Sequence, residues 1–467
     1  MGGFRLAVLV ASVIGMVGCG GGTGPTPPPP PPPDPNAVAT VEITAESAGM
    51  LVGDTISTTV VVKNAAGAVV TGKTVTFTSS DPNVVTAATD GRLAGKALGG
   101  PVTITAAVEG KQGTAAMTVR ADRRLAYLTI TNATGPWAPT TDNSYSSSGQ
   151  PMTITTPAVG RFDVRLAGLA SLPGQRTNIQ VGLYGTTGNV ANRSHCGVTG
   201  WENSGPDLVA HLNCFNTAGA AINWPFSMVV SGAETFPARS GFVRVANGAP
   251  ADAGVVRGEA AWSSARQAPT VVRYGPGFYG VQFPGLDRPI PGAADMVFVT
   301  ASSADNRRCH AMPYATSPME VMVRCYSGTT PTNSGFSAML VSQAPAGHGF
   351  GFGTPTGPVV PQANQLGNLL FSYNSSGGDV RFTQAGTGEY VISFKQLTLG
   401  GAGKHLFLPI AFSNSSAAVC SVGGSETVPE LTVTIQCYDP ESVKEFETRG
   451  GLSLLSQRSR DSTERHG

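Results

Sequence analysis

Apolar and polar residues alternate with a period of two along much of the chain, and no stretch shows a helical period. Residues 37–120 contain five such runs, which glycine and Asn/Asp turns separate: Val41–Ile43, Val60–Lys63, Val75–Thr78, Val102–Thr105 and Met117–Val119. Short alternating strands between turn residues are typical of sandwiches of antiparallel sheets. The pattern therefore predicts an all-β fold built of tandem antiparallel β-sandwiches.

The remainder of the chain contains a threefold repeat. Three ten-residue strings of the form G-x-(F/Y)-x-(V/I)-x-(L/F)-x-x-L begin at Gly160, Gly277 and Gly388. Alternate positions of each string are apolar, so each string predicts a strand with one buried face. An aromatic residue with serines after it lies fifteen residues before each string: Tyr145, Trp262 and Tyr373. The shared spacing indicates three copies of one folding unit.

Each copy also contains two cysteines, of which the second ends an alternating strand. The pairs are Cys196 and Cys214, Cys309 and Cys325, and Cys420 and Cys437. Two cysteines per copy in an exported protein indicate one local disulfide each. Six cysteines allow 15 pairings, but the repeat favours pairing within each copy, where a short loop brings the Cα atoms within reach of a disulfide.

A metal site is the alternative use of these cysteines, and it needs four converging ligands. His195 lies beside Cys196 and His310 beside Cys309, but no histidine lies near Cys420. The ligand pattern therefore breaks in the third copy. We expect no metal, and we expect His195 and His310 to be solvated loop residues.

The chain begins with a pattern that is typical of a secretion signal. Arg5 precedes the apolar run Leu6–Val17, which is too short to span a bilayer as a helix but has the length of a signal-peptide core. The run ends in Met16-Val-Gly-Cys19, which resembles the lipobox of bacterial lipoproteins. That resemblance implies cleavage before Cys19 and lipidation of Cys19. A plain signal peptide with a chance cysteine is the alternative, although the six other cysteines pair without Cys19.

Residues 37–120 resemble a bacterial Ig-like domain of group 2 (BIG2). The matching segments, in order, are Leu51–Thr55, Val62–Gly67, Val75–Pro82, Gly91–Gly95, Gly100–Thr105 and Gly113–Val119. The resemblance implies an Ig-like sandwich of the kind found in bacterial adhesins and other surface proteins. Many such domains are spacers, and that structural role is the alternative to binding. The three repeats are not assigned to a named family.

The proline run Pro27–Pro33 predicts a stiff polyproline II rod ahead of this domain. The sequence thus predicts a signal peptide (1–18), a Gly/Pro-rich linker (19–36), a BIG2-type domain (37–120), β repeats at 121–241, 242–346 and 347–455, and a polar tail (456–467). We expect the repeats to be independently folded units with small contacts between them.

Composition and motifs limit the chemistry. The 467 residues carry 30 Lys+Arg and 29 Asp+Glu, a net charge of +1, whereas a nucleic-acid binder needs a basic face. No G-x-S-x-G, H-E-x-x-H, P-loop or dinucleotide-binding pattern occurs. We therefore expect no nucleic-acid partner, no cofactor and no catalysis. An extracellular hydrolase of unfamiliar type is the less favoured alternative.

The aromatic residues of the repeats are the candidate binding residues. Tyr145, Trp262 and Tyr373 are candidates for stacking on the apolar C–H face of a sugar; the alternative is that they are core residues. Trp137 and Trp201 lie in loop-like sequence and are further contact candidates. The hypothesis is a non-catalytic lipoprotein, anchored in the outer membrane or at the cell surface, that binds glycans or surface proteins. A purely structural envelope stalk without a ligand is the alternative.

Overall fold

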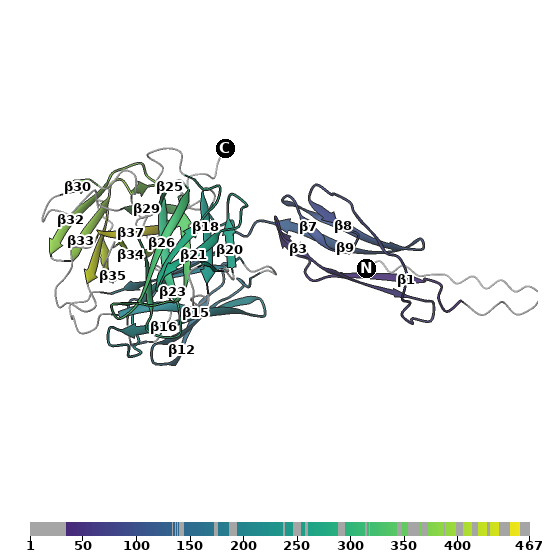
Figure 1. The fold of residues 1–467 in the computed structure, drawn as a ribbon, viewed down its shortest axis with the longest axis horizontal. Coiled ribbons are helices and arrows are strands. Elements are labelled where there is room, and N and C mark those ends of the chain that lie inside the picture. Colours follow the sequence, from purple (N-terminus) through teal and green to yellow (C-terminus); the bar gives the residue numbers. More distant parts are fainter. Residues whose placement is uncertain are drawn as a thin grey trace, which may run out of the picture.

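The computed structural model describes residues 34–132, 134–135, 137, 139, 144–171, 176–185, 194–236, 239–245, 254–256, 260–287, 295–312, 315–316, 318–342, 348–353, 364–366, 372–386, 388–397, 405–412, 419–426, 430–438 and 449–457. The expected signal peptide, Cys19, the proline run and the last ten residues lie outside this set. Regular secondary structure in the described residues is entirely β (Figure 1), which confirms the predicted fold class. In the same residues, no helix is long and apolar enough to cross a membrane.

Residues 34–120 form what we call the N-terminal sandwich. Its strands are β1 (Thr40–Ala45), β2 (Gly49–Leu51), β3 (Thr55–Ile56), β4 (Thr58–Lys63), β5 (Thr76–Ser79), β6 (Val85–Ala87), β7 (Leu93–Gly95), β8 (Gly99–Val108) and β9 (Lys111–Arg120). They pair in the sheets β2-β9-β8-β5, β3-β7-β6 and β1-β4. Strand β8 links two cores, because Val102 and Ile104 belong to one hydrophobic cluster and Ala106 and Val108 to the other.

The first repeat is a sandwich of eight strands. These are β10 (Leu125–Thr129), β11 (Ser144–Ser146), β12 (Met152–Ala158), β13 (Arg161–Leu166), β14 (Asn178–Tyr184), β15 (Ser194–Ser204), β16 (Asp207–Asn216) and β17 (Phe226–Ser231). The order β11-β10-β17-β14 forms one sheet, which we call inner, and β12-β13-β16-β15 forms the other, which we call outer.

The second repeat has the same two sheets with three short additional strands. Its strands are β18 (Ser240–Val245), β19 (Gly254–Val256), β20 (Ala260–Ser263), β21 (Thr270–Gly275), β22 (Phe278–Gln282), β23 (Met296–Ser302), β24 (Arg308–Ala311), β25 (Ala315–Thr316), β26 (Met319–Ser327), β27 (Thr330–Pro331) and β28 (Gly335–Val341). The inner sheet is β20-β18-β28-β23 and the outer sheet β19-β21-β22-β26-β24.

The third repeat follows the same plan and joins its outer sheet to the first repeat. Its strands are β29 (His348–Gly353), β30 (Gln365–Leu366), β31 (Tyr373–Asn374), β32 (Val380–Gly386), β33 (Glu389–Phe394), β34 (His405–Phe412), β35 (Val419–Glu426), β36 (Leu431–Tyr438) and β37 (Arg449–Gln457). The inner sheet is β31-β29-β37-β34, and the outer sheet is β30-β32-β33-β36-β35. Parallel pairing of β35 with β14 fuses this outer sheet with the first repeat's inner sheet into nine strands.

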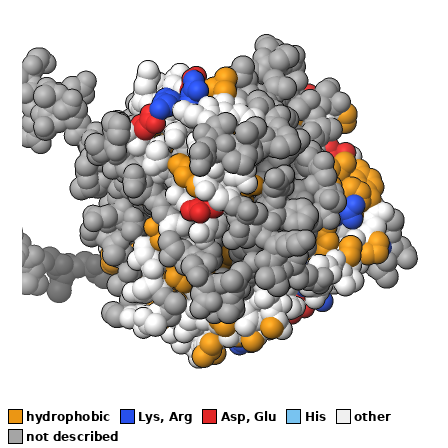
Figure 2. Space-filling view, turned by 90° about the vertical axis from the view of Figure 1, so that its left-hand side faces the viewer, with side chains coloured by type: hydrophobic (Ala, Val, Ile, Leu, Met, Phe, Trp, Pro, Cys, Tyr) orange, Lys and Arg blue, Asp and Glu red, His pale blue; other side chains and the backbone are white. Residues whose placement is uncertain are grey.

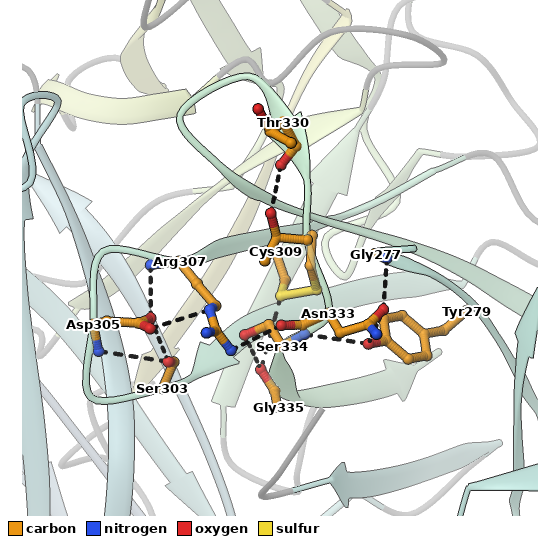
Figure 3. The surroundings of a disulfide bond; sticks show 12 residues. Gly277, Tyr279, Ser303, Asp305, Arg307, Cys309, Thr330, Asn333, Ser334 and Gly335 are labelled. Atoms are coloured by element: carbon orange, nitrogen blue, oxygen red, sulfur yellow. Dashed lines mark hydrogen bonds and ion pairs between the residues drawn. A yellow bond between two sulfur atoms is a disulfide. The ribbon is translucent and has the colours of Figure 1, made fainter. Parts of the chain in front are cut away.

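The string that defines the repeat begins at a glycine for a geometric reason. Gly160, Gly277 and Gly388 have φ values of 72°, 61° and 72°, which glycine adopts without steric cost. At each of them the carbonyl accepts a hydrogen bond from the second cysteine of the copy, at 2.8, 2.8 and 2.7 Å. The glycine turn therefore positions the disulfide strand. Figure 3 shows this corner in the second copy, where Asn333 Oδ1 also accepts the Gly277 N–H at 2.9 Å.

The disulfides are Cys196–Cys214, Cys309–Cys325 and Cys420–Cys437, the three pairs that the repeat predicts. Each joins residues directly opposite each other on neighbouring antiparallel strands. The main-chain N–H of Cys214 donates to Gly160 and its carbonyl accepts from Ile222. Both groups thus point away from Cys196. This leaves the close, non-hydrogen-bonded type of cross-strand pair that a disulfide can bridge.

The central strands of the inner sheets in the first two repeats are buried on both faces, so the expectation of small contacts between repeats is wrong. Along β10, Ala126 and Leu128 face the core of the first repeat, whereas Leu125 and Tyr127 face a second cluster. We call this second cluster the shared core. It contains Leu125, Tyr127, Val229, Ala233, Phe236, Phe242, Trp262, Met296, Phe298, Met339 and Val341, with Tyr145 and Tyr373 packed against it. All three repeats thus contribute to it, and we call residues 121–457 the three-repeat body.

A buried hydrogen-bond network reinforces the junction between the first two repeats. Thr300 Oγ1 donates to Gln180 Oε1 at 2.7 Å and accepts from the Val181 N–H at 3.0 Å. Asn178 Oδ1 accepts from Gln180 Nε2 at 2.9 Å and from Ser337 Oγ at 3.2 Å. Asn178, Gln180, Thr300 and Ser337 are all at most 3% exposed. Separating the repeats would leave these groups to be re-solvated, and a satisfied buried network fixes one arrangement of its members.

Two arginines of the three-repeat body contact the N-terminal sandwich, which lies to one side of it in Figure 1. Arg176 Nη2 lies 2.8 Å from Asp54 Oδ1, and Asp54 is buried in the turn between β2 and β3. Arg266 Nη1 donates to the Val52 carbonyl at 3.4 Å. Burial raises the pKa of Asp54, while its hydrogen bond from the Leu51 N–H and the nearby Arg176 charge act in the opposite direction. This contact orients the N-terminal sandwich.

We predict that an isolated repeat is unstable. Residues 239–346 alone would expose Phe242, Trp262, Met296, Phe298, Met339 and Val341. At about 1.5–3 kcal/mol for each buried apolar side chain, the loss is on the order of 10 kcal/mol, comparable with the whole stability of a domain. Circular dichroism melts of residues 239–346 and of residues 121–457, both with disulfides formed, test this. A sharp unfolding transition for the isolated repeat, as steep as that of the larger fragment, would contradict the shared core.

We also predict that Gly277→Ala is destabilising and that Gly275→Ala is tolerated. A Cβ at Gly277 would lie 2.3 Å from the Cys325 carbonyl oxygen on a left-handed backbone, whereas a Cβ at Gly275 meets no atom within 4 Å. The expected loss of unfolding free energy is at least about 1–2 kcal/mol for the first variant and within about 0.5 kcal/mol for the control. Urea unfolding measures both. Equal losses would show that the glycine turn does not position the disulfide strand.

Candidate functional site

The three repeats close around a central cavity of about 90 Å³. One cysteine of each disulfide lines it: Cys196, Cys309 and Cys420. The side chains of Gln180 and Thr300, which link the first two repeats, lie in the same wall. The disulfide corners of the three copies therefore converge where the repeats meet.

His195 and His310 also line this cavity, so the expectation of solvated loop histidines is wrong. His195 lies in β15 and His310 in β24, and each is 7% exposed. Each ring stacks on an aromatic ring of the neighbouring strand, with centroids 5.8 Å apart for His195 and Phe215 and 5.6 Å apart for His310 and Tyr326. Their strands lie at the junction of the repeats, and the neighbouring repeat covers what a single copy would leave exposed.

The electrostatics of the cavity keep His195 neutral. Burial and the positive charge of Arg308 together lower the pKa of His195 to about 4, against the opposing effects of the hydrogen bond to the Asn306 backbone and of the Asp305 charge. The described residues that line the cavity include no Asp or Glu, and their cysteines are in disulfides. A cysteine in a disulfide is not available as a thiolate nucleophile. The cavity residues serve the junction between the repeats.

The aromatic residues that the repeat singles out belong to the shared core. Trp262 is 7% exposed and packs 6.3 Å from Phe242 between ring centroids. Tyr145 is half-buried and stacks on Tyr127 at 5.4 Å, and Tyr373 packs against the same cluster. Tyr145, Trp262 and Tyr373 are therefore core residues, which was the alternative to a sugar-binding role. The interpretation of Trp262 as a stacking surface for sugars is wrong, because the inner sheets of the repeats enclose its ring.

The two other candidate tryptophans are also engaged by the protein. Trp137 packs edge-on against Phe162, with ring centroids 5.0 Å apart. Trp201 lies within strand β15 and not in a loop, and the Arg244 guanidinium of the second repeat covers its ring at 4.3 Å. Both residues are half-buried. Their ring faces contact the chain itself, so they contribute to packing and to the junction between repeats.

The outer sheets carry polar groupings that periodicity alone does not reveal. On the first repeat, His211 Nδ1 lies 2.7 Å from Asp163 Oδ1, and His211 Nε2 lies 4.0 Å from Glu202 Oε1. Strands β13 and β16 place Asp163 directly opposite His211. The imidazole thus lies between two carboxylates, with neither nitrogen directed at a hydroxyl or thiol nucleophile. The signal that could have revealed it is the polar residue at an outward position of each strand.

Comparison with known proteins gives no relative for these features. No protein-family model matches the chain, and no curated protein matches it. Among the described residues, no group of three or more His, Cys, Asp or Glu side chains could hold a metal ion. On the face shown in Figure 2, the charged side chains of the described residues are scattered and do not form a patch of one sign.

We predict that His195 makes stability depend on pH between about 4 and 6.5. In this window the unfolded imidazole, with an ordinary pKa near 6.5, takes up a proton that the folded state excludes, so the free energy of unfolding falls as the pH falls. The full loss is about 3 kcal/mol. Urea unfolding of the wild type and His195→Phe from pH 7 to pH 4 tests this, with His211→Asn, a half-buried histidine of the outer sheet, as the control. Equal pH slopes for the wild type and His195→Phe would contradict a buried neutral histidine.

Proposed function

We propose that the chain is a non-catalytic lipoprotein, anchored through Cys19, that displays the three-repeat body as a rigid binding module away from the membrane. The observation that carries the proposal is the shared core, which makes the three repeats one body with fixed outer faces. The N-terminal sandwich, which resembles a BIG2 domain in sequence, lies to one side of this body (Figure 1) and acts in this proposal as a spacer.

The disulfides support export. Three cross-strand disulfides, one in each copy, persist in oxidising compartments and not in the cytosol. The apolar run before Cys19 supplies the signal, and the proline run after it supplies a stiff spacer of about 3 Å per residue. The proposed location is therefore the outer membrane or the cell surface, with the lipid as the membrane contact.

A purely structural envelope component remains the second candidate. It is favoured by the use of Tyr145, Trp262 and Tyr373 in the shared core, because the aromatic residues that every copy provides hold the body together. The two candidates differ on the outer sheets. A binding module carries on them a group of residues that a ligand can reach, whereas a stalk needs only solvated faces.

We predict that Cys19→Ser abolishes anchoring and leaves the fold intact. Loss of the acyl group should move the protein from the detergent phase to the aqueous phase after Triton X-114 partitioning. The control is Cys309→Ala together with Cys325→Ala, which removes a disulfide and keeps Cys19. A Cys19→Ser protein that partitions into detergent like the wild type would contradict lipidation at Cys19.

A further inference from the structure

The outer sheet of the second repeat carries an exposed aromatic residue that has no counterpart in the other copies. Tyr274, in β21, is 45% exposed. It comes from the outer face, so the shared core does not use it. An accessible ring on a rigid sheet is a usual anchor for a ligand.

The Tyr274 ring lies across the neighbouring strand over Gly280. A Cβ built on Gly280 would lie 2.7 Å from Tyr274 Cε2 and 2.2 Å from Glu320 Oε1. Gly280 is therefore the residue that lets the ring of β21 and the carboxylate of β26 meet above β22. Gly280 is the fourth residue of its string, and the same position is Asp163 in the first copy and Val391 in the third. A side chain at this position would occupy the space of the ring, so the arrangement is particular to the second copy.

Polar groups are held around the ring by hydrogen bonds. Tyr274 Oη donates to Glu320 Oε1 at 2.5 Å, and Gln282 Nε2 lies 3.4 Å from the same oxygen. Thr270 Oγ1 donates to Gln282 Oε1 at 3.1 Å. The Phe278 ring lies 5.5 Å from that of Tyr274. We call Thr270, Tyr274, Phe278, Gln282 and Glu320 the Tyr274 patch.

The proton of the Tyr274 hydroxyl is committed to Glu320, and this hydrogen bond raises the pKa of Tyr274. The phenol therefore stays neutral, and its oxygen remains an acceptor for a ligand hydroxyl. The second carboxylate oxygen of Glu320 is a further acceptor. Arg324 places its guanidinium 3.9 Å over the Phe278 ring. The side-chain acceptors next to the Tyr274 ring are therefore the Glu320 carboxylate and the Gln282 amide.

We infer that the Tyr274 patch is a binding subsite for a neutral saccharide. The Tyr274 ring offers an apolar surface for the C–H face of a pyranose, and Glu320, Gln282 and Thr270 offer hydrogen-bond partners to its hydroxyls. The Glu320 carboxylate disfavours a uronate or sulfated sugar by like-charge repulsion. The inference rests on the proposed binding function, because it names the ligand class of the three-repeat body.

The test uses the full chain with Cys19→Ser, so that no acyl group contributes. Isothermal titration calorimetry with hexasaccharides of β-1,4-linked glucose, β-1,4-linked N-acetylglucosamine and α-1,6-linked mannose measures binding. We expect at least one neutral hexasaccharide to bind with a Kd of about 1 mM or tighter, and a hexamer of galacturonate to bind at least about tenfold more weakly. Tyr274→Ala is expected to weaken binding of the neutral sugar by at least about tenfold, through loss of the ring.

Two further variants distinguish a loss of binding caused by the Tyr274 patch from a loss caused by unfolding. Gly280→Val leaves Tyr274 in the sequence but fills the space of its ring with the residue type of the third copy, and it is expected to weaken binding as strongly as Tyr274→Ala. Glu202→Gln, on the first repeat, is the charge-matched control for Glu320→Gln, and only Glu320→Gln should lower affinity. Melting temperatures confirm that each variant is folded.

The inference is overturned if none of the three neutral hexasaccharides binds with a Kd of about 1 mM or tighter, if the galacturonate hexamer binds within about tenfold of the best of them or more tightly, or if folded Tyr274→Ala and Gly280→Val bind like the parent. These outcomes do not depend on anchoring. If the protein partitions into detergent through Cys19 but does not bind the sugars, the proposed anchoring stands and the proposed saccharide site is wrong.

Discussion

Burial of the inner sheets of the first two repeats on both faces is the constraint on which the rest of the structure depends. Each of these two repeats closes one side of its inner sheet against its own outer sheet and leaves the other side to the shared core. Neighbouring residues such as Val297 and Phe298 thus belong to different cores. The repeats therefore lie close together, and the network of Gln180 and Thr300 and the buried His195 and His310 lie where they meet.

The sequence shows this constraint in only one respect. The outer strands alternate, as in Gly277–Leu286, whereas Phe226–Ser231 is buried throughout and contains three consecutive apolar residues, Met228–Val230. Continuous runs mark strands that are covered on both sides. The all-β class and the cysteine pairs were predictable because periodicity and spacing are local. The association of the repeats was not, because an apolar strand does not specify which surface covers it.

The difference between local pattern and tertiary arrangement also explains which candidate binding residues the sequence could identify. Tyr145, Trp262 and Tyr373 recur at one offset, and recurrence in every copy marks what the common architecture needs, which is the core. Tyr274 recurs in no other copy, and it meets Gly280 and Glu320 only through the register of three strands. A residue that departs from the repeat is therefore a better candidate for ligand contact than one that defines it. In this account the features that all three copies share build the folded body, and Tyr274 of the second repeat contacts the ligand.

Calorimetry of residues 34–457 with intact disulfides tests the central claim most directly. If the shared core makes the repeats one unit, the three-repeat body unfolds in a single transition whose calorimetric enthalpy equals its van't Hoff enthalpy. Unfolding of the N-terminal sandwich is a second, smaller transition. Three resolved transitions for the repeats, each with the enthalpy of about 110 residues at about 0.7 kcal/mol per residue, would contradict the account.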